Sequence, residues 1–130
     1  MEFNRSLEVI EKKEDQRIVL GVALVPGVED AQGDVIFAEE IAQGAHDFMA
    51  NYRAQRTHMG IMHKATTNKV VILESYIAPV DLYVNGKTII EGSWVVKIKV
   101  NDEQIWKKVK TGEFQAFSIG GSGKRIPMEA

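Results

Sequence analysis

The stretch of sequence that decides the fold is residues 17–25, Arg-Ile-Val-Leu-Gly-Val-Ala-Leu-Val, which is apolar at odd and even positions alike. Successive side chains of a strand point to opposite faces, so this pattern predicts a strand that is buried on both sides. Pro26 and Gly27 end it, because proline has no amide hydrogen for a ladder and glycine favours turns. Residues 92–100 are a second apolar strand, whose one face carries Trp94, Val96, Ile98 and Val100.

Further strands are predicted from alternating or apolar segments over residues 6–12, 61–65, 70–78 and 113–119. Most connections between neighbouring strands are short, which favours antiparallel pairing because a parallel crossover needs a dozen residues or more. The fold class predicted from this order is α+β. We expect a mostly antiparallel β-barrel with flanking helices, closed or nearly closed because several strands are apolar on both faces.

Two helices are expected among these strands, over about 38–53 and about 102–110. The second helix has Asn101 as its expected N-cap, with Gln104 in position for a capping box, and Gly112 suits its C-terminal end. The first helix is marked by an apolar stripe at helical spacing, made of Ile41, Ala45, Phe48, Met49 and Tyr52.

The composition is that of one soluble domain over residues 1–130, with a loose tail from about 120 that is either whole or cut short. The net charge is −2, from 16 basic and 18 acidic residues without a basic stretch, so we expect no nucleic-acid partner. No apolar run is long enough to span a bilayer, so we expect no membrane association. The absence of cysteine excludes disulfides, thiolate metal sites and a cysteine nucleophile, and we expect no metal and no cofactor.

Three chemically capable residues stand on strand faces that are otherwise small or apolar. Glu74 shares a face with Val70, Ile72 and Tyr76, where an ionised carboxylate is costly unless it is paired or hydrogen-bonded. His63 stands between Ile61 and Ala65 on its strand face, and Ser118 follows Phe114 and Ala116 on another. A strand-edge glutamate, a structural histidine and a small serine that simply fits are the plainer interpretations of each.

Together these residues are the set that a nucleophilic hydrolase needs. The hydroxyl of Ser118 attacks, the imidazole of His63 takes its proton, and a third group such as Glu74 orients the imidazole. Gly120 and Gly121 leave the backbone after the serine unobstructed, so their amides could stabilise an oxyanion, although a flexible turn is the plainer interpretation of the glycines by themselves. Spacing alone does not bring the three residues together.

The ordered set of segments resembles the XkdF-like phage serine proteases, over about residues 17–125. This family is similar to the phage prohead proteases and, more distantly, to the herpesvirus assemblins. The segments that carry the resemblance are Gln32-Gly33-Asp34, Met62-His63-Lys64, Val70 to Ile77, Gly92-Ser93-Trp94-Val95-Val96 and Gly112 to Gly121.

The resemblance implies an assemblin-like barrel in which Ser118 is the nucleophile and His63 the base. It leaves the third catalytic residue open among Glu74, which we favour for its burial cost, Glu129, and a residue beyond this chain. Arg125 lies where assemblins place an oxyanion amide. The implied substrates are the phage scaffold and major capsid protein, cleaved inside the assembling prohead in the bacterial host cytoplasm. A homodimer or higher homo-oligomer is among the expected assemblies.

Two other functions compete with this hypothesis. A non-catalytic assembly module on the same fold, binding capsid or portal protein, would account for the chain after Ser118, which has no histidine and whose only acid is Glu129 at its extreme end. A histidine-based metal hydrolase is a more distant alternative, because His58 and His63 do not have the spacing of a helical zinc motif.

Overall fold

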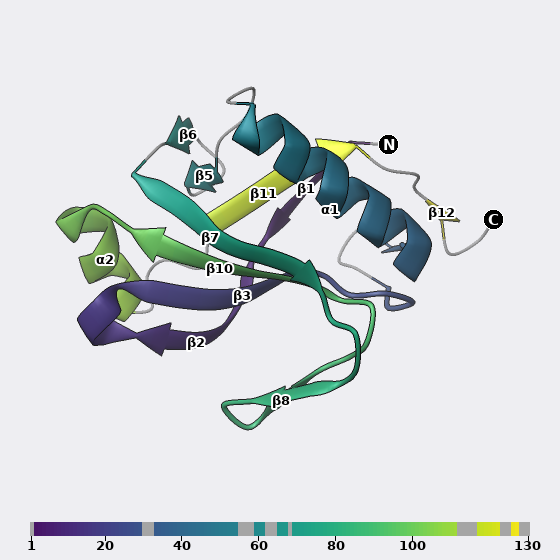
Figure 1. Ribbon diagram of the computed structural model, residues 1–130, viewed down its shortest axis with the longest axis horizontal. Helices are drawn as coiled ribbons and strands as arrows, with labels where there is room; N and C mark the ends of the chain where they lie inside the picture. Colours follow the sequence, from purple (N-terminus) through teal and green to yellow (C-terminus); the bar gives the residue numbers. More distant parts are fainter. Residues whose placement is uncertain are drawn as a thin grey trace.

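The computed structural model describes residues 2–29, 33–54, 59–61, 65–67, 69–111, 117–122 and 126–127, with side chains over 7–29, 33–54 and 69–111. The strands form two antiparallel four-stranded sheets (Figure 1). The first sheet has the order β1 (Glu2–Ser6), β11 (Phe117–Ser122), β5 (Met59–Ile61) and β6 (Ala65–Thr67). The second has the order β2 (Glu8–Lys13), β3 (Ile18–Leu24), β10 (Trp94–Val100) and β7 (Val70–Ile77).

The two sheets are joined at both of their edges by short pieces of chain. Only the buried Leu7 separates β1 from β2, and only residues 68 and 69 separate β6 from β7. The α+β class and the antiparallel pairing are therefore confirmed. The ladders among the described residues form separate sheets, and a closed barrel is not detected among them.

Strand β3 is buried along nearly its whole length, as its two-sided apolar pattern predicts. On one side Val19, Ala23 and Leu24 belong to the main core, and on the other Leu20 and Val22 belong to a second, smaller core. Each of the three ladders of this sheet contains a register shift, and such irregularities bend and twist a sheet. The bent sheet thus has one apolar layer on each side.

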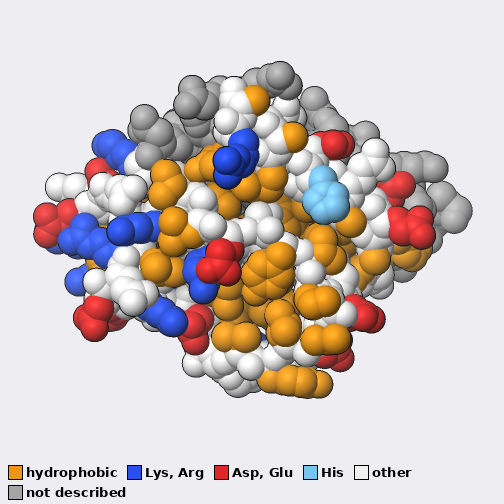
Figure 2. All heavy atoms as spheres, in the orientation of Figure 1, with side chains coloured by type: hydrophobic (Ala, Val, Ile, Leu, Met, Phe, Trp, Pro, Cys, Tyr) orange, Lys and Arg blue, Asp and Glu red, His pale blue; other side chains and the backbone are white. Residues whose placement is uncertain are grey.

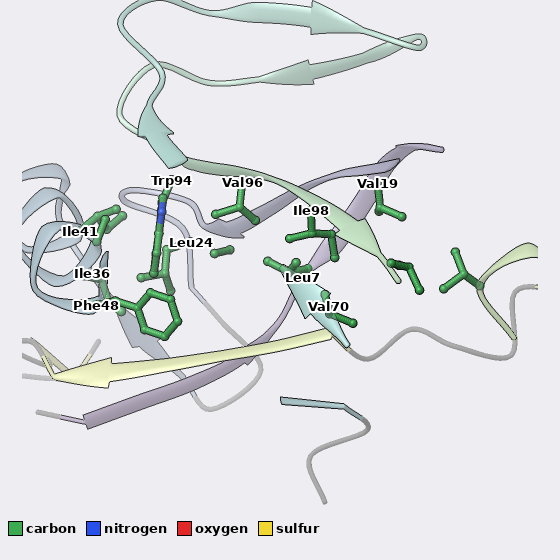
Figure 3. Close-up of a cluster of buried hydrophobic side chains, with 14 of the residues drawn as sticks. Leu7, Val19, Leu24, Ile36, Ile41, Phe48, Val70, Trp94, Val96 and Ile98 are labelled. Carbon is green, nitrogen blue, oxygen red and sulfur yellow. The ribbon is translucent and has the colours of Figure 1, made fainter. Parts of the chain in front are cut away.

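The main core lies between the second sheet and strands β1 and β11, with side chains from helix α1 (Ala38–Arg53) entering it (Figure 3). Trp94 is fully buried and meets the edge of Phe48 at a centroid distance of 5.6 Å. Its indole N–H donates to Ser75 Oγ at 2.9 Å. The predicted stripe of the first helix is confirmed, because Ile41, Ala45 and Phe48 are buried while Met49 and Tyr52 pack partly buried against the core.

The second core lies under an arm formed by β8 (Leu82–Val84) and β9 (Lys87–Ile89). Asn85 and Gly86 both have positive φ, at 51° and 75°, as a two-residue hairpin turn of the Asn-Gly kind requires. Asn85 Nδ2 donates to the carbonyl oxygen of Ile10 at 2.9 Å. This bond ties the tip of the arm to β2, so the apolar side of the arm covers part of the outer face of the sheet.

Several predicted boundaries are wrong in detail. The strand expected over 61–65 is two short strands, β5 and β6, whose ends Ile61 and Ala65 are register partners. The tail expected to be loose from about 120 contains the rest of β11, paired with β1, and β12 (Ile126–Pro127), paired with β4 (Asp34–Val35). Each piece pairs with a strand that is distant in the sequence, and this pairing satisfies its backbone N–H and C=O groups. The local sequence does not show such a partner.

The second helix, α2 (Glu103–Lys110), has Asp102 as its N-cap in place of Asn101. The amide of Ile105 donates to Asp102 Oδ1 at 2.9 Å, and Lys69 Nζ lies 3.3 Å from the other carboxylate oxygen. The pKa of the Asp102 carboxyl is lowered from its ordinary value of 3.8, chiefly by the hydrogen bond from Ile105 and further by Lys69. The carboxylate is therefore the form that the fold stabilises.

We predict that Asp102→Ala lowers the thermal unfolding midpoint at neutral pH, while Asp102→Asn, which keeps a capping oxygen, lowers it less. Because the pKa of Asp102 is depressed in the folded state, its charge stabilises the fold above pH 3.8 and stops doing so as the pH falls through the lowered value. The gap between wild type and Asp102→Asn should therefore close in acid. Circular dichroism melts of the three proteins measure this, and identical midpoints at neutral pH would contradict it.

Candidate functional site

Ser118 lies near the start of β11, at the point where this strand has a partner on each side. Its register partners are Ser6 on β1 and Gly60 on β5. The backbone of Ser118 is thus held by ladders on both sides, which is the kind of rigid support that a nucleophile requires. The side chain of Ser118 is outside the described side chains.

Strand β5, which pairs with β11 at Ser118, is the strand that leads to His63. The pairing Phe117↔Ile61 follows Ser118↔Gly60, and β5 ends at Ile61. His63 is two residues further along the chain and lies outside the described residues. The described backbone therefore brings Ser118 beside a residue only three positions before His63 in the sequence. The pairing of the two side chains stays a prediction.

Glu74 does not lie on the face that simple alternation predicts, because β7 contains a bulge. Lys97 of β10 pairs with Glu74, but the next residue, Ile98, pairs with Ile72. Leu73 is therefore an extra residue, and it shifts the phase of every side chain that follows. Ile72 and Ile77 pack against the main core and Ser75 accepts its hydrogen bond from Trp94, so Glu74 is on the opposite face.

The burial argument that favoured Glu74 is consequently wrong. Its side chain is 52% exposed, and Lys97 Nζ lies 3.2 Å from its Oε2 atom. The main core separates β10 from β11, so the outer face of the second sheet, which carries Glu74, is directed away from the strand of Ser118 (Figure 3). Glu74 is an exposed carboxylate that is paired with Lys97. Its role as a third catalytic residue stays a prediction, but the cost of burial that motivated this prediction is absent.

Gly120 and Gly121 belong to β11, where Asn4 and Phe3 of β1 are their register partners. Adjacent residues of a strand direct their amides to opposite sides, so one of these two amides points toward β1 and the other points away from it. The flexible glycine turn is therefore replaced by a fixed strand. Arg125 and Glu129 lie outside the described residues.

Two buried polar residues were not singled out as candidates by the sequence patterns. Asp34 is buried in β4, opposite Pro127 of β12. Ser93 is fully buried at the start of β10, and its Oγ atom has no hydrogen-bond partner among the described residues. The signal in the sequence for both was a polar residue placed directly before apolar ones: Asp34 precedes Val35-Ile36, and Ser93 precedes Trp94.

Comparison with known proteins gives a match to one protein family. Residues 6–127 match the model of the family described as "Putative phage serine protease XkdF". The match covers the second sheet and both helices, and in the first sheet it covers β11, β5 and β6 but only Ser6 of β1. No solved structure matches the chain.

Two curated relatives come from Bacillus subtilis (strain 168). The "Phage-like element PBSX protein XkdF" is 35% identical over 122 residues, which are 92% of this chain and 42% of that protein. The "Uncharacterized protein YqbD" is 33% identical over 126 residues, which are 96% of this chain and 38% of that protein. The chain thus spans about two fifths of the length of these relatives.

The two faces of β7 after the bulge predict losses of stability of different size on mutation. Glu74→Gln should change the free energy of unfolding by less than about 1 kcal/mol, because it removes only an exposed ion pair. Ser75→Ala should cost about 1–3 kcal/mol, because it removes the acceptor of a buried indole N–H. Denaturant unfolding of both variants measures the difference. A large loss from Glu74→Gln, with a small one from Ser75→Ala, would show that the phase of β7 is the reverse of the one described.

Proposed function

The chain belongs to the phage serine protease family of XkdF, and from that premise we propose that it is a prohead serine endopeptidase with Ser118 as nucleophile and His63 as general base. The observation that carries the proposal is the pairing of Ser118 with Gly60, three residues before His63 in the chain. Three residues of chain span at most about 11 Å. His63 is thus at most this far from the residue that pairs with Ser118, which supports an interaction of the two side chains.

The proposed reaction begins when His63 accepts the proton of Ser118 and the hydroxyl oxygen attacks the scissile carbonyl carbon. The amide of Gly120 or Gly121 that points away from β1 is the proposed donor to the oxyanion, with the backbone near Arg125 as the second candidate. His63 then protonates the leaving amine, and the peptide bond breaks to give an acyl-enzyme. Water, deprotonated by His63, releases the acid product and restores the serine.

The proposed substrates are extensions of the phage scaffold and major capsid proteins, cleaved during capsid maturation inside the prohead in the host cytoplasm. The phage origin in the family description supports this setting. No helix in the part of the chain that the structure describes could cross a membrane. A closed, assemblin-like barrel belongs to the same proposal, and the continuity of the chain at both sheet edges supports it.

The alternative is a non-catalytic module on the same fold that binds capsid or portal protein. The exposed, lysine-paired state of Glu74 favours this alternative, because it removes the burial argument for a third catalytic residue. The two functions differ in whether Ser118 is nucleophilic, and a direct chemical test separates them.

We predict that a fluorophosphonate probe labels Ser118 in the folded protein and that Ser118→Ala abolishes both labelling and scaffold cleavage. Ser122→Ala is the matched control, since Ser122 lies on the same strand and should leave labelling unchanged. Mass spectrometry of the labelled peptide identifies the modified residue. If the folded wild-type protein is not labelled, the non-catalytic module is the better interpretation.

Glu74→Gln tests the third catalytic residue separately. Because Glu74 lies on the outer face and is already paired with Lys97, we expect the labelling rate of Ser118 to stay within a few-fold of wild type. Loss of a triad carboxylate lowers rates by about 10⁴-fold. A loss of that size in a folded Glu74→Gln protein would therefore restore Glu74 to the triad.

A further inference from the structure

Exposed hydrophobic side chains are concentrated on one side of the molecule. Of the seven large ones exposed among the described residues, five come from β7 and the β8–β9 arm with its base: Leu73, Tyr76, Val80, Tyr83 and Ile90. Figure 2 shows hydrophobic side chains gathered over this part of the molecule. Contiguous apolar surface of this kind marks interaction sites in soluble proteins. We call the outer side of β7 and the base of the arm, with Leu73, Glu74, Tyr76, Val80 and Ile90, the β7 face.

The β7 face is the part of the outer side of the second sheet that the arm leaves uncovered. The arm packs Leu82, Val84 and Ile89 over β2, β3 and the start of β10 and forms the second core there. The bulge at Leu73 then turns Glu74 and Tyr76 outward, next to that core. Leu73 remains 47% exposed and Tyr76 36% exposed.

One ion pair lies in this apolar surface. Glu74 is two residues from Tyr76 on the same side of β7, and its partner Lys97 stands opposite on β10. The two charges cancel, so the face carries a dipole and no net charge there. A wholly apolar partner would bury this pair without compensation, which costs free energy.

A second copy of this chain is the partner that compensates the pair. Under a two-fold axis that lies in the interface plane, perpendicular to the line joining the two charges, the Glu74–Lys97 dipole meets its own copy in antiparallel orientation, with each carboxylate beside the other copy's ammonium. The surrounding apolar side chains meet their equivalents, and tyrosines are favoured at the energetic centre of interfaces. A stable interface needs about 800 Å² from each partner, more than one strand provides, so the base of the arm must contribute.

We propose that two copies of this chain associate through the β7 face around a two-fold axis near the Glu74–Lys97 pair. The interface is self-complementary in charge and apolar in its surroundings. It lies on the side of the second sheet away from the strand of Ser118, so the assembly does not depend on catalysis.

Charge reversal at the pair tests the proposal, because non-specific hydrophobic association would not depend on the signs of these two charges. Glu74→Lys gathers four ammonium groups at the axis of the homodimer, and Lys97→Glu gathers four carboxylates. Each variant alone should dimerise about a hundredfold or more weakly than wild type, because like charges facing across an interface are strongly unfavourable. An equimolar mixture should form a heterodimer, since two lysines then face two glutamates. Sedimentation velocity of each protein and of the mixture measures this.

Lys69→Glu is the matched control. It makes the same charge change as Lys97→Glu and removes an exposed lysine from another ion pair, 3.3 Å from Asp102, just before the start of β7. This variant should sediment as wild type does. Circular dichroism checks that all variants are folded, which is expected because exposed ion pairs contribute little to stability.

The expected result is a wild-type dimer, monomeric single variants and a heterodimer in the mixture. Wild type that sediments as a monomer over a wide range of concentrations would overturn the proposal. So would single variants that dimerise as tightly as Lys69→Glu, or a mixture of folded variants that stays monomeric.

Discussion

The burial of Trp94 is the interaction on which the rest of the structure depends. The indole begins β10, the strand that pairs with β3 on one side and β7 on the other. It is fully buried and contacts Phe48, which attaches helix α1 to the second sheet. A buried indole must also place its N–H against an acceptor, and Ser75 Oγ is that acceptor. One side chain therefore constrains the helix, the central strand and the phase of the edge strand together.

The bulge in β7 is consistent with this constraint. Strict alternation from Val70 would direct Glu74 into the core and Ser75 out to solvent. With Leu73 as an extra residue, Ser75 reaches Trp94 while Glu74 reaches Lys97. An extra residue in a ladder costs less than an unpaired carboxylate in a core. A polar residue that interrupts an apolar strand pattern can thus mark a bulge as well as a catalytic site.

The main core separates the two surfaces that bear on function. The strand of Ser118 lies across the main core from β10, and the β7 face lies on the outer side of the second sheet. Ser118 itself is held between β1 and β5, so the candidate nucleophile is supported by the first sheet alone. A change on the β7 face can therefore be made without touching the ladders that hold Ser118.

Periodicity and composition, by themselves, determined the two-sided burial of β3, the apolar face of β10 and the stripe of α1, because these follow from which side chains can leave water. The resemblance of ordered segments identified the family and named Ser118 and His63. Only the tertiary structure decided that Asp102 caps α2, that Glu74 faces solvent and that Gly60 lies beside Ser118. Each of these depends on a partner distant in the chain or on an extra residue in a ladder, and local spacing carries no information about either.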